Sequence, residues 1–176
     1  MSENNLKDSY FLISNNSMSS EGERFLNYVL GAHEEYDAVV LALQQCLWQT
    51  GNQIRPTNGC WVASNTNGIS LLDIGAGSGH LLSRLVSELH IVKYVAFESD
   101  VSLARLLIET TKNVGKAVPE FLGEVHAEAF TSSTEVAIQA DIVLICHSLY
   151  GQVNKLAIIQ SAARFVAKDG LLIVFH

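Results

Sequence analysis

The residues best suited to chemistry lie in one glycine-rich segment, Leu71-Leu-Asp73-Ile-Gly75-Ala-Gly77-Ser-Gly79-His80. Glycine has no Cβ, so three glycines at alternate positions allow a tight turn and a close approach of the backbone to a ligand. Asp73 places a carboxylate just before this turn. A carboxylate there disfavours a pyrophosphate group and favours a ligand with an ammonium or sulfonium group. The segment predicts a binding loop for a cationic small molecule.

Two alternatives for this loop follow from the residues. A nicotinamide or flavin dinucleotide site needs Gly-x-Gly-x-x-Gly/Ala, whereas here His80 holds the last position and Gly79 comes one residue early. A dinucleotide-dependent oxidoreductase is therefore the weaker hypothesis. The other alternative is a glycine-rich turn without a ligand, which the surrounding strand-loop-helix pattern disfavours.

The elements that must position the loop alternate between strands and helices. Apolar runs predict strands over 69–74, 91–97, 121–127, 141–146 and 171–175. Apolar residues at helical spacing predict helices over 79–90, from an Asp100 cap onward, and over 152–167. This alternation predicts an α/β fold with a doubly wound, mainly parallel sheet. Ligands of such sheets bind beyond the carboxyl ends of the strands, where the glycine loop lies.

The remainder of the chain divides by composition. Residues 1–20 are rich in serine and asparagine and are expected to be a flexible N-terminus. Residues 21–50 carry two helical patterns, about 21–30 and 34–48, which predict an N-terminal helical cap. Residues 51–68 are rich in turn formers and predict a loop or linker. Residues 69–176 then form the core that binds the ligand.

Composition narrows the partners and the compartment. The net charge is −7 and Lys and Arg do not cluster, so neither a nucleic-acid nor a membrane-surface partner is expected. The three cysteines form no Cys-x-x-Cys pair, and the N-terminus lacks the features of a secretory signal, which favours a cytoplasmic protein. The histidines show no spacing typical of metal ligands, so no metal site is predicted.

From Ile69 to about Phe175 these residues resemble the class I S-adenosylmethionine-dependent methyltransferases, whose first motif is an acidic residue followed by x-Gly-x-Gly-x-Gly. The resemblance implies a Rossmann-like fold and S-adenosylmethionine as cofactor, whose amino-acid end Asp73, Gly75, Gly77 and Gly79 hold. It also implies that Glu98, at the end of the second strand, accepts hydrogen bonds from both ribose hydroxyls. The alternative for Glu98 is a solvated carboxylate before the next helix. The implied cofactor-binding set is completed by Ala76, Ser99 and Cys146.

The adenine end is expected near the loop after the third strand. There the resemblance implies contacts from Glu128, Thr131 or Ser132, with Phe130 against the adenine face. A helix cap and a core phenylalanine are the equally weighted alternative. Cys146 ends a buried strand, and we expect its thiol to be an inert core group and not a nucleophile.

The acceptor side is expected after the fourth strand. His147 and Tyr150 are candidates for catalysis and substrate positioning there, with a backbone-bonded His147 as the alternative. The segment lacks the Asn/Asp-Pro-Pro-Tyr sequence of methylases that act on bases or protein amides. Short matches at 23–27, 126–135 and 148–150 resemble the histamine N-methyltransferase-like group. They imply a small-molecule acceptor with a nitrogen nucleophile, whose amine Glu34 or Glu35 is a candidate to bind, with a solvated surface carboxylate as the alternative.

The number of strands in the sequence bears on the prediction of an active methyltransferase. A class I methyltransferase sheet has seven strands, whereas this sequence ends at His176, where the fifth is expected to end. We therefore expect a core that lacks the last two strands and leaves the 171–175 strand as an exposed edge. Two consequences are open: self-association through that edge, or a truncated or non-catalytic module that binds the cofactor without turnover.

Overall fold

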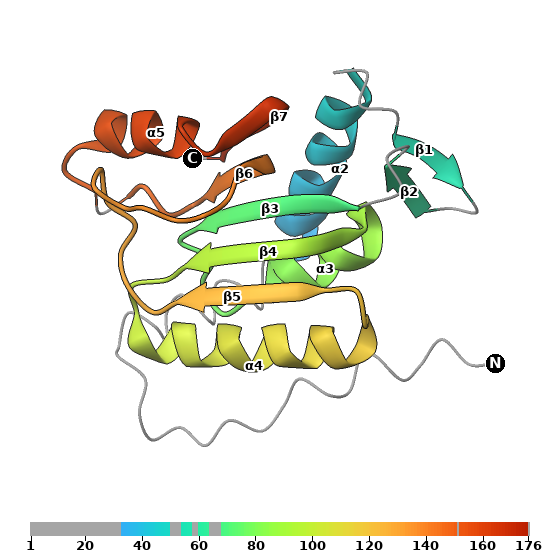
Figure 1. Ribbon diagram of the computed structural model, residues 1–176, viewed down its shortest axis with the longest axis horizontal. Helices are drawn as coiled ribbons and strands as arrows, with labels where there is room; N and C mark the ends of the chain where they lie inside the picture. Colours follow the sequence, from blue (N-terminus) through green and yellow to red (C-terminus); the bar gives the residue numbers. More distant parts are fainter. Residues whose placement is uncertain (1–32, 50–53, 58–59, 64–67, 151, 176) are drawn as a thin grey trace.

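The computed structural model describes residues 33–49, 54–57, 60–63, 68–150 and 152–175, which centre on one sheet (Figure 1). Its strands are β3 (Ile69–Ile74), β4 (Ile91–Phe97), β5 (Leu122–His126), β6 (Ala140–Cys146) and β7 (Val166–Phe175). They pair in the order β5-β4-β3-β6-β7, and every pairing is parallel. The central strand β3 comes first in sequence; β4 and β5 then extend the sheet on one side, and β6 and β7 extend it on the other. The predicted doubly wound parallel sheet is confirmed.

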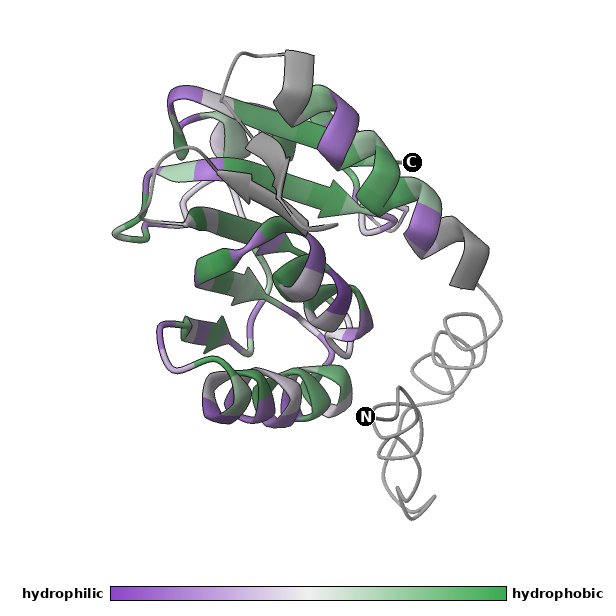
Figure 2. Ribbon diagram, turned by 90° about the vertical axis from the view of Figure 1, so that its right-hand side faces the viewer, coloured by the Kyte–Doolittle hydropathy of each residue, from purple (hydrophilic) through white to green (hydrophobic). Residues whose placement is uncertain are grey.

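Helices cover both faces of this sheet. They are α2 (His33–Gln49), α3 (His80–Leu89), α4 (Val101–Ala117) and α5 (Lys155–Ala163). One core joins α2, α3 and α4 to one face, and a second core joins α5 and the 130–138 segment to the other. Because side chains alternate along a strand, Leu71 packs in the first core and Leu72 in the second. Figure 2 shows the resulting apolar strands between helices of mixed hydropathy.

Local sequence explains where the central elements begin. Asp100 caps α4 as predicted, since its Oδ1 accepts hydrogen bonds from the backbone N–H groups of Ser102 and Leu103 at 2.8 and 3.0 Å. Strands β3 and β4 have the predicted bounds. Their apolar residues are buried on both faces, which is why the sequence shows continuous apolar runs there. These elements fix the two strand ends that meet at the glycine loop.

The helix predicted over 152–167 is wrong at both ends. It begins at Lys155, because the Asn154 side chain accepts a hydrogen bond from Ala157 N at 3.1 Å and caps it. It ends at Ala163, because Val166 pairs with Ala140 and already belongs to β7. Between Val166 and Leu171 the register shifts, and Asp169 has a φ of 70° in this irregular stretch. The pairing of Val166 with β6 therefore determines the structure here, although the apolar residues have helical spacing.

The loop predicted over 51–68 contains a hairpin. Strands β1 (Ile54–Thr57) and β2 (Cys60–Ala63) pair antiparallel, with Thr57 opposite Cys60. The intervening Asn-Gly pair is the sequence signature of a two-residue hairpin. The predicted flexible N-terminus and the predicted helix over 21–30 lie outside the described residues. No helix within the described ranges has the length and apolarity needed to cross a membrane.

Candidate functional site

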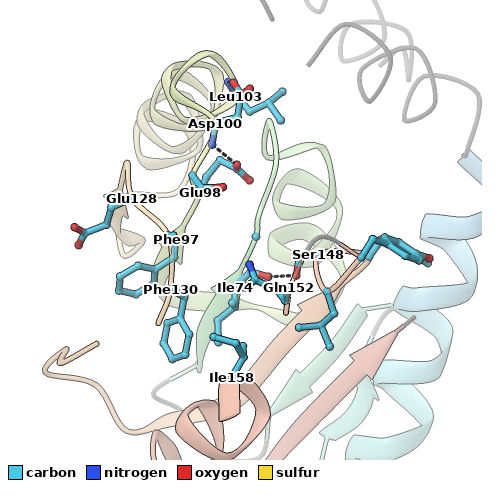
Figure 3. A pocket seen from close by; sticks show the side chains of 16 residues that line it. Ile74, Phe97, Glu98, Asp100, Leu103, Glu128, Phe130, Ser148, Gln152 and Ile158 are labelled. Atoms are coloured by element: carbon cyan, nitrogen blue, oxygen red, sulfur yellow. Dashed lines mark hydrogen bonds between the residues drawn. The ribbon is translucent and has the colours of Figure 1, made fainter. Parts of the chain in front are cut away.

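A cleft of about 330 Å³ lies at the carboxyl ends of the strands (Figure 3). Its lining residues come from the segments that follow β3, β4, β5 and β6, together with the start of α4 and Ile158 of α5. Because all these strands are parallel, their carboxyl ends meet at one edge of the sheet. Seven of the residues proposed from the sequence line it: Gly75, Glu98, Ser99, Glu128, Phe130, His147 and Tyr150.

The glycine loop forms one wall of the cleft. Gly75, Gly77 and Gly79 have φ angles of 74°, 61° and 84°, in the left-handed region that favours glycine. A Cβ on Gly75 would lie 2.1 Å from the Cβ of Ser148, so no other residue fits there unchanged. The loop is fixed to β4, since the backbone N–H of Gly75 donates to the carbonyl of Phe97 at 2.8 Å. Of the three glycines, Gly75 lines the cleft and the other two do not.

Glu98 is a buried carboxylate at the end of β4, and only 7% of the residue is exposed. Its Oε2 accepts a hydrogen bond from Gly77 N at 2.8 Å, and its Oε1 accepts one from Asp100 N at 2.7 Å. Each carboxylate oxygen can accept a second bond. Glu98 is therefore held in one orientation by two backbone groups and retains the capacity to accept donors from a ligand. It is not the solvated carboxylate of the alternative interpretation.

Asp73 lies beneath the loop, outside the cleft lining. Its side chain is on the face of the sheet that carries Leu71 and the helices α2 and α3, whereas the next residue, Ile74, lines the cleft. Asp73 is 3% exposed, and its Oδ2 accepts a hydrogen bond from Tyr94 Oη at 3.1 Å. Burial raises the pKa of Asp73 to about 7; the Tyr94 bond opposes this rise and the Glu98 charge adds to it.

Tyr94 was missed by the sequence analysis. It lies in β4 and is fully buried, and its pKa is raised well above its usual value by burial and by the charge of Asp73. A buried tyrosine hydroxyl needs a hydrogen-bond partner. A tyrosine in the middle of an apolar strand, expected beside the strand that carries Asp73, was the available signal. The hydrogen bond between Asp73 and Tyr94 keeps both polar side chains in the core directly below the glycine loop.

The segment after β5 divides the predicted adenine residues into two groups. Phe130 is buried and packs edge-to-face on Phe97, with ring centroids 5.3 Å apart, and both rings line the cleft. Glu128 lines the cleft as well. Thr131 and Ser132 do not line it: the Thr131 backbone N–H donates to the side chain of Thr134, and the Ser132 carbonyl accepts from Arg164. Those two residues stabilise the loop itself.

His147 and Tyr150 lie together on the opposite wall. The His147 Nδ1 and the Tyr150 Oη are 3.2 Å apart and hydrogen bonded, and their rings stack with an interplanar angle of 8°. Tyr150 is 64% exposed. His147 has a φ of 51°, an unusual backbone conformation for a residue other than glycine. The candidate acceptor residues are thus brought to the same cleft as Glu98.

Two of the remaining predicted residues lie outside the cleft lining, and one residue that was not predicted belongs to it. Cys146 and Ala76 adjoin the cleft in sequence but do not line it, and the side chain of Glu34 lies outside the described part of the chain. Ser148 was not proposed as a site residue, yet it lines the cleft, and its Oγ donates to the Ile74 carbonyl at 2.7 Å. Within the described residues, no group of three or more His, Cys, Asp or Glu is arranged to hold a metal ion.

Comparison with solved structures identifies the fold. The sugar N-methyltransferase KedS8 from Streptoalloteichus matches with a TM-score of 0.59 at 12% identity, over 94% of this chain and 57% of that chain. DesVI from Streptomyces venezuelae matches with a TM-score of 0.56 at 14% identity, over 90% and 58%. Coclaurine N-methyltransferase bound to N-methylheliamine and S-adenosylhomocysteine (SAH) matches with a TM-score of 0.53 at 20% identity, over 77% and 35%.

These matches define the architecture at the level of the fold. No protein-family model and no curated protein sequence matches the chain. The chain spans 35% to 58% of the length of the three solved proteins. The chain therefore has the Rossmann-like fold found in these methyltransferases.

Proposed function

We propose that this chain binds S-adenosylmethionine and transfers its methyl group to a nitrogen atom of a small-molecule acceptor. The observation that carries the proposal is the position of Glu98, a buried carboxylate that lines the cleft and bonds to the glycine loop. A carboxylate is costly to bury, so one that is held by backbone N–H groups at a ligand cleft indicates a binding role. The fold shared with the N-methyltransferases above supports the same class of reaction.

The residues of the cleft fit this cofactor. The remaining lone pairs of Glu98 suit the paired hydroxyls of a ribose. Phe97 and Phe130 supply an apolar aromatic surface of the kind that an adenine ring contacts. The Glu98 carboxylate, which accepts a hydrogen bond from Gly77 N, places negative charge beside the glycine loop, and this favours a ligand with a positive charge.

The same charges disfavour the dinucleotide alternative. A pyrophosphate in the cleft would lie beside the carboxylates of Glu98 and Asp100, both of which line it. Like charges in close proximity repel one another. The loop also lacks the glycine spacing of a dinucleotide site. An oxidoreductase therefore remains the weaker hypothesis.

When bound, S-adenosylmethionine supplies an electrophilic methyl group on a sulfonium ion. The chain's own residues position the two reactants. The glycine loop and Glu98 orient the cofactor, and His147 and Tyr150 orient the acceptor from the other side of the cleft. Well-oriented bimolecular steps gain on the order of 7–11 kcal/mol from proximity. Most of the rate enhancement is therefore assigned to positioning.

His147 is also placed to remove a proton from an acceptor amine. In the tautomer in which Nδ1 carries the hydrogen and donates to Tyr150 Oη, Nε2 carries the lone pair that accepts a proton. An imidazole whose ring is oriented by a hydrogen bond is a common general base in enzymes. The proposed acceptor is a small amine, as the resemblance to the histamine N-methyltransferase-like group implies.

Titration calorimetry with S-adenosylmethionine, SAH and NADH tests the cofactor. We expect the first two to bind, and Glu98→Gln to weaken SAH binding about 10- to 100-fold, since a bond to a charged group contributes about 1.5–3 kcal/mol. The matched control is Glu109→Gln, which removes an exposed carboxylate on α4 and should leave binding unchanged. NADH binding without SAH binding would contradict the proposal.

A second assay separates a methyltransferase from a non-catalytic binding module. The chain is incubated with S-adenosylmethionine and a panel of small amines, and formation of SAH is measured. Acceptor-dependent SAH formation that His147→Gln reduces supports transfer. Cofactor binding without SAH formation for any amine in the panel would favour the binding module.

A further inference from the structure

Ser148 joins the two walls of the cleft. Its Oγ donates a hydrogen bond to the Ile74 carbonyl at 2.7 Å, which links the turn after β6 to the end of β3 (Figure 3). Its Cβ lies against Gly75, where an added Cβ would come within 2.1 Å. Ser148 therefore contacts the glycine loop both by a hydrogen bond and by close packing.

The same turn carries the candidate acceptor residues. His147 precedes Ser148, and Tyr150 follows it by two positions. The His147 backbone N–H donates to the Phe175 carbonyl at 3.0 Å, so the turn is also fixed to β7. The unusual backbone conformation of His147, with a φ of 51°, is thus held between two anchors. Of these anchors, only Ser148 bonds to the strand that leads into the glycine loop.

We propose that Ser148 is a positioning residue that couples the glycine loop to the His147–Tyr150 pair. A ligand that orders the loop also sets the turn, because the two segments share one packed contact and one hydrogen bond. Groups in direct contact respond to perturbation together, whereas distant groups respond independently. The proposal rests on the proposed function, since the ligand at the loop is the cofactor.

Nuclear magnetic resonance of the chain with ¹³C-labelled histidine tests this coupling. The His147 ring resonance is assigned by its loss in His147→Gln, and SAH is then titrated in. We expect SAH to shift this resonance in the unaltered chain. In Ser148→Ala we expect SAH to bind about three- to tenfold more weakly. We also expect the shift of the His147 resonance at saturation to fall by at least half.

Ser70 offers a matched control between the same two strands. Its Oγ donates to Asp141 Oδ2 at 2.6 Å, at the opposite ends of β3 and β6 from the cleft. The Ser70 Oγ also accepts from Asp141 N at 3.0 Å, so Ser70→Ala removes two hydrogen bonds between these strands. It should lower thermal stability and leave the SAH-induced shift of His147 unchanged. If Ser148→Ala does not fold, Ser148→Cys, which keeps the side-chain shape with a slightly larger atom and a weaker donor, replaces it.

Three results would overturn the coupling. A full shift of His147 in Ser148→Ala at SAH saturation means that the turn responds without the serine bond. An equal loss of the shift in Ser70→Ala means that general weakening of the sheet explains the effect. Failure of SAH to bind the folded, unaltered chain overturns the proposed function and the coupling with it. In the first two results cofactor binding stands.

Discussion

The two walls of the cleft are built in different ways. The wall of β3 and β4 holds the buried carboxylate of Glu98, which is fixed by backbone N–H groups at 2.7 and 2.8 Å, and the buried Asp73 lies beneath it. The wall after β6 carries a side-chain pair, His147 and Tyr150, and the tyrosine is largely exposed. One wall is fixed by main-chain bonds in the core, and the other presents side chains near solvent.

This difference matches two kinds of ligand. A buried carboxylate with its partners already in place cannot reorient without losing hydrogen bonds, so it recognises one arrangement of donors. An exposed side-chain pair reorients at little cost and can accommodate acceptors of different shapes. We infer that the first wall suits an invariant cofactor and the second a variable substrate. Changes to the first wall should therefore have larger effects on SAH binding than changes to the second.

Gly75→Ala should have the largest effect, because it damages the first wall directly. A left-handed conformation costs a residue with a Cβ about 1–2 kcal/mol, and overpacking against Ser148 adds about 1–3 kcal/mol. We expect the free energy of unfolding to fall by about 2–5 kcal/mol and SAH binding to be lost. Urea unfolding and calorimetry measure the two quantities.

Gly115→Ala is the control for that substitution. Gly115 lies within α4, and an added Cβ there would meet nothing closer than 3.9 Å. Alanine stabilises a helix interior by about 0.5–1 kcal/mol relative to glycine. We expect a small gain in stability and unchanged SAH binding. Equal losses in both variants would mean that the Gly75 result reflects a general intolerance of added side chains.

Asp73→Asn should change the free energy of unfolding by an intermediate amount, and this change should depend on pH. Because burial raises the pKa of Asp73 to about 7, the folded chain keeps a proton that the unfolded chain releases above pH 4. The free energy of unfolding should therefore fall as the pH rises from about 4 to about 7. One pKa unit corresponds to about 1.4 kcal/mol, so the Asp73 contribution between pH 5 and 8 is roughly 2–3 kcal/mol.

Urea unfolding of both chains at pH 5 and pH 8 measures this contribution. Asparagine cannot titrate, and its side-chain carbonyl can still accept the Tyr94 hydrogen bond. We expect Asp73→Asn to lose the Asp73 part of the decrease and to be the more stable chain at pH 8. The same decrease in both chains would show that Asp73 is ionised in the folded state throughout this range.

Tyr150→Phe should have the smallest effect on SAH binding. It removes one exposed hydrogen bond to His147 from the second wall, which contributes about 0.5 kcal/mol. We expect SAH affinity to change less than about threefold, whereas the rate of methyl transfer should fall because His147 loses the Tyr150 hydrogen bond that orients its ring. A tenfold loss of SAH affinity would remove the distinction between the two walls.

Sequence patterns predicted the elements that carry the first wall. Apolar runs at 69–74 and 91–97 gave strands with the observed bounds, and Asp100 marked the start of α4. These features depend on local propensity and on burial of both sheet faces, which sequence reports directly. The boundaries of α5 and β7 were wrong because pairing of Val166 with Ala140 is a long-range contact that local periodicity does not encode.

By itself the sequence determined the parallel sheet, the glycine loop and the Glu98 position, because each follows from residue types within a short stretch of chain. Only the tertiary structure decided which side chains share the cleft. It turned Asp73 away toward Tyr94, left Thr131 and Ser132 outside, and brought Ser148 against Gly75 across 73 positions of sequence. Strand alternation and contacts between distant segments determine these outcomes, and both are fixed only when the sheet assembles.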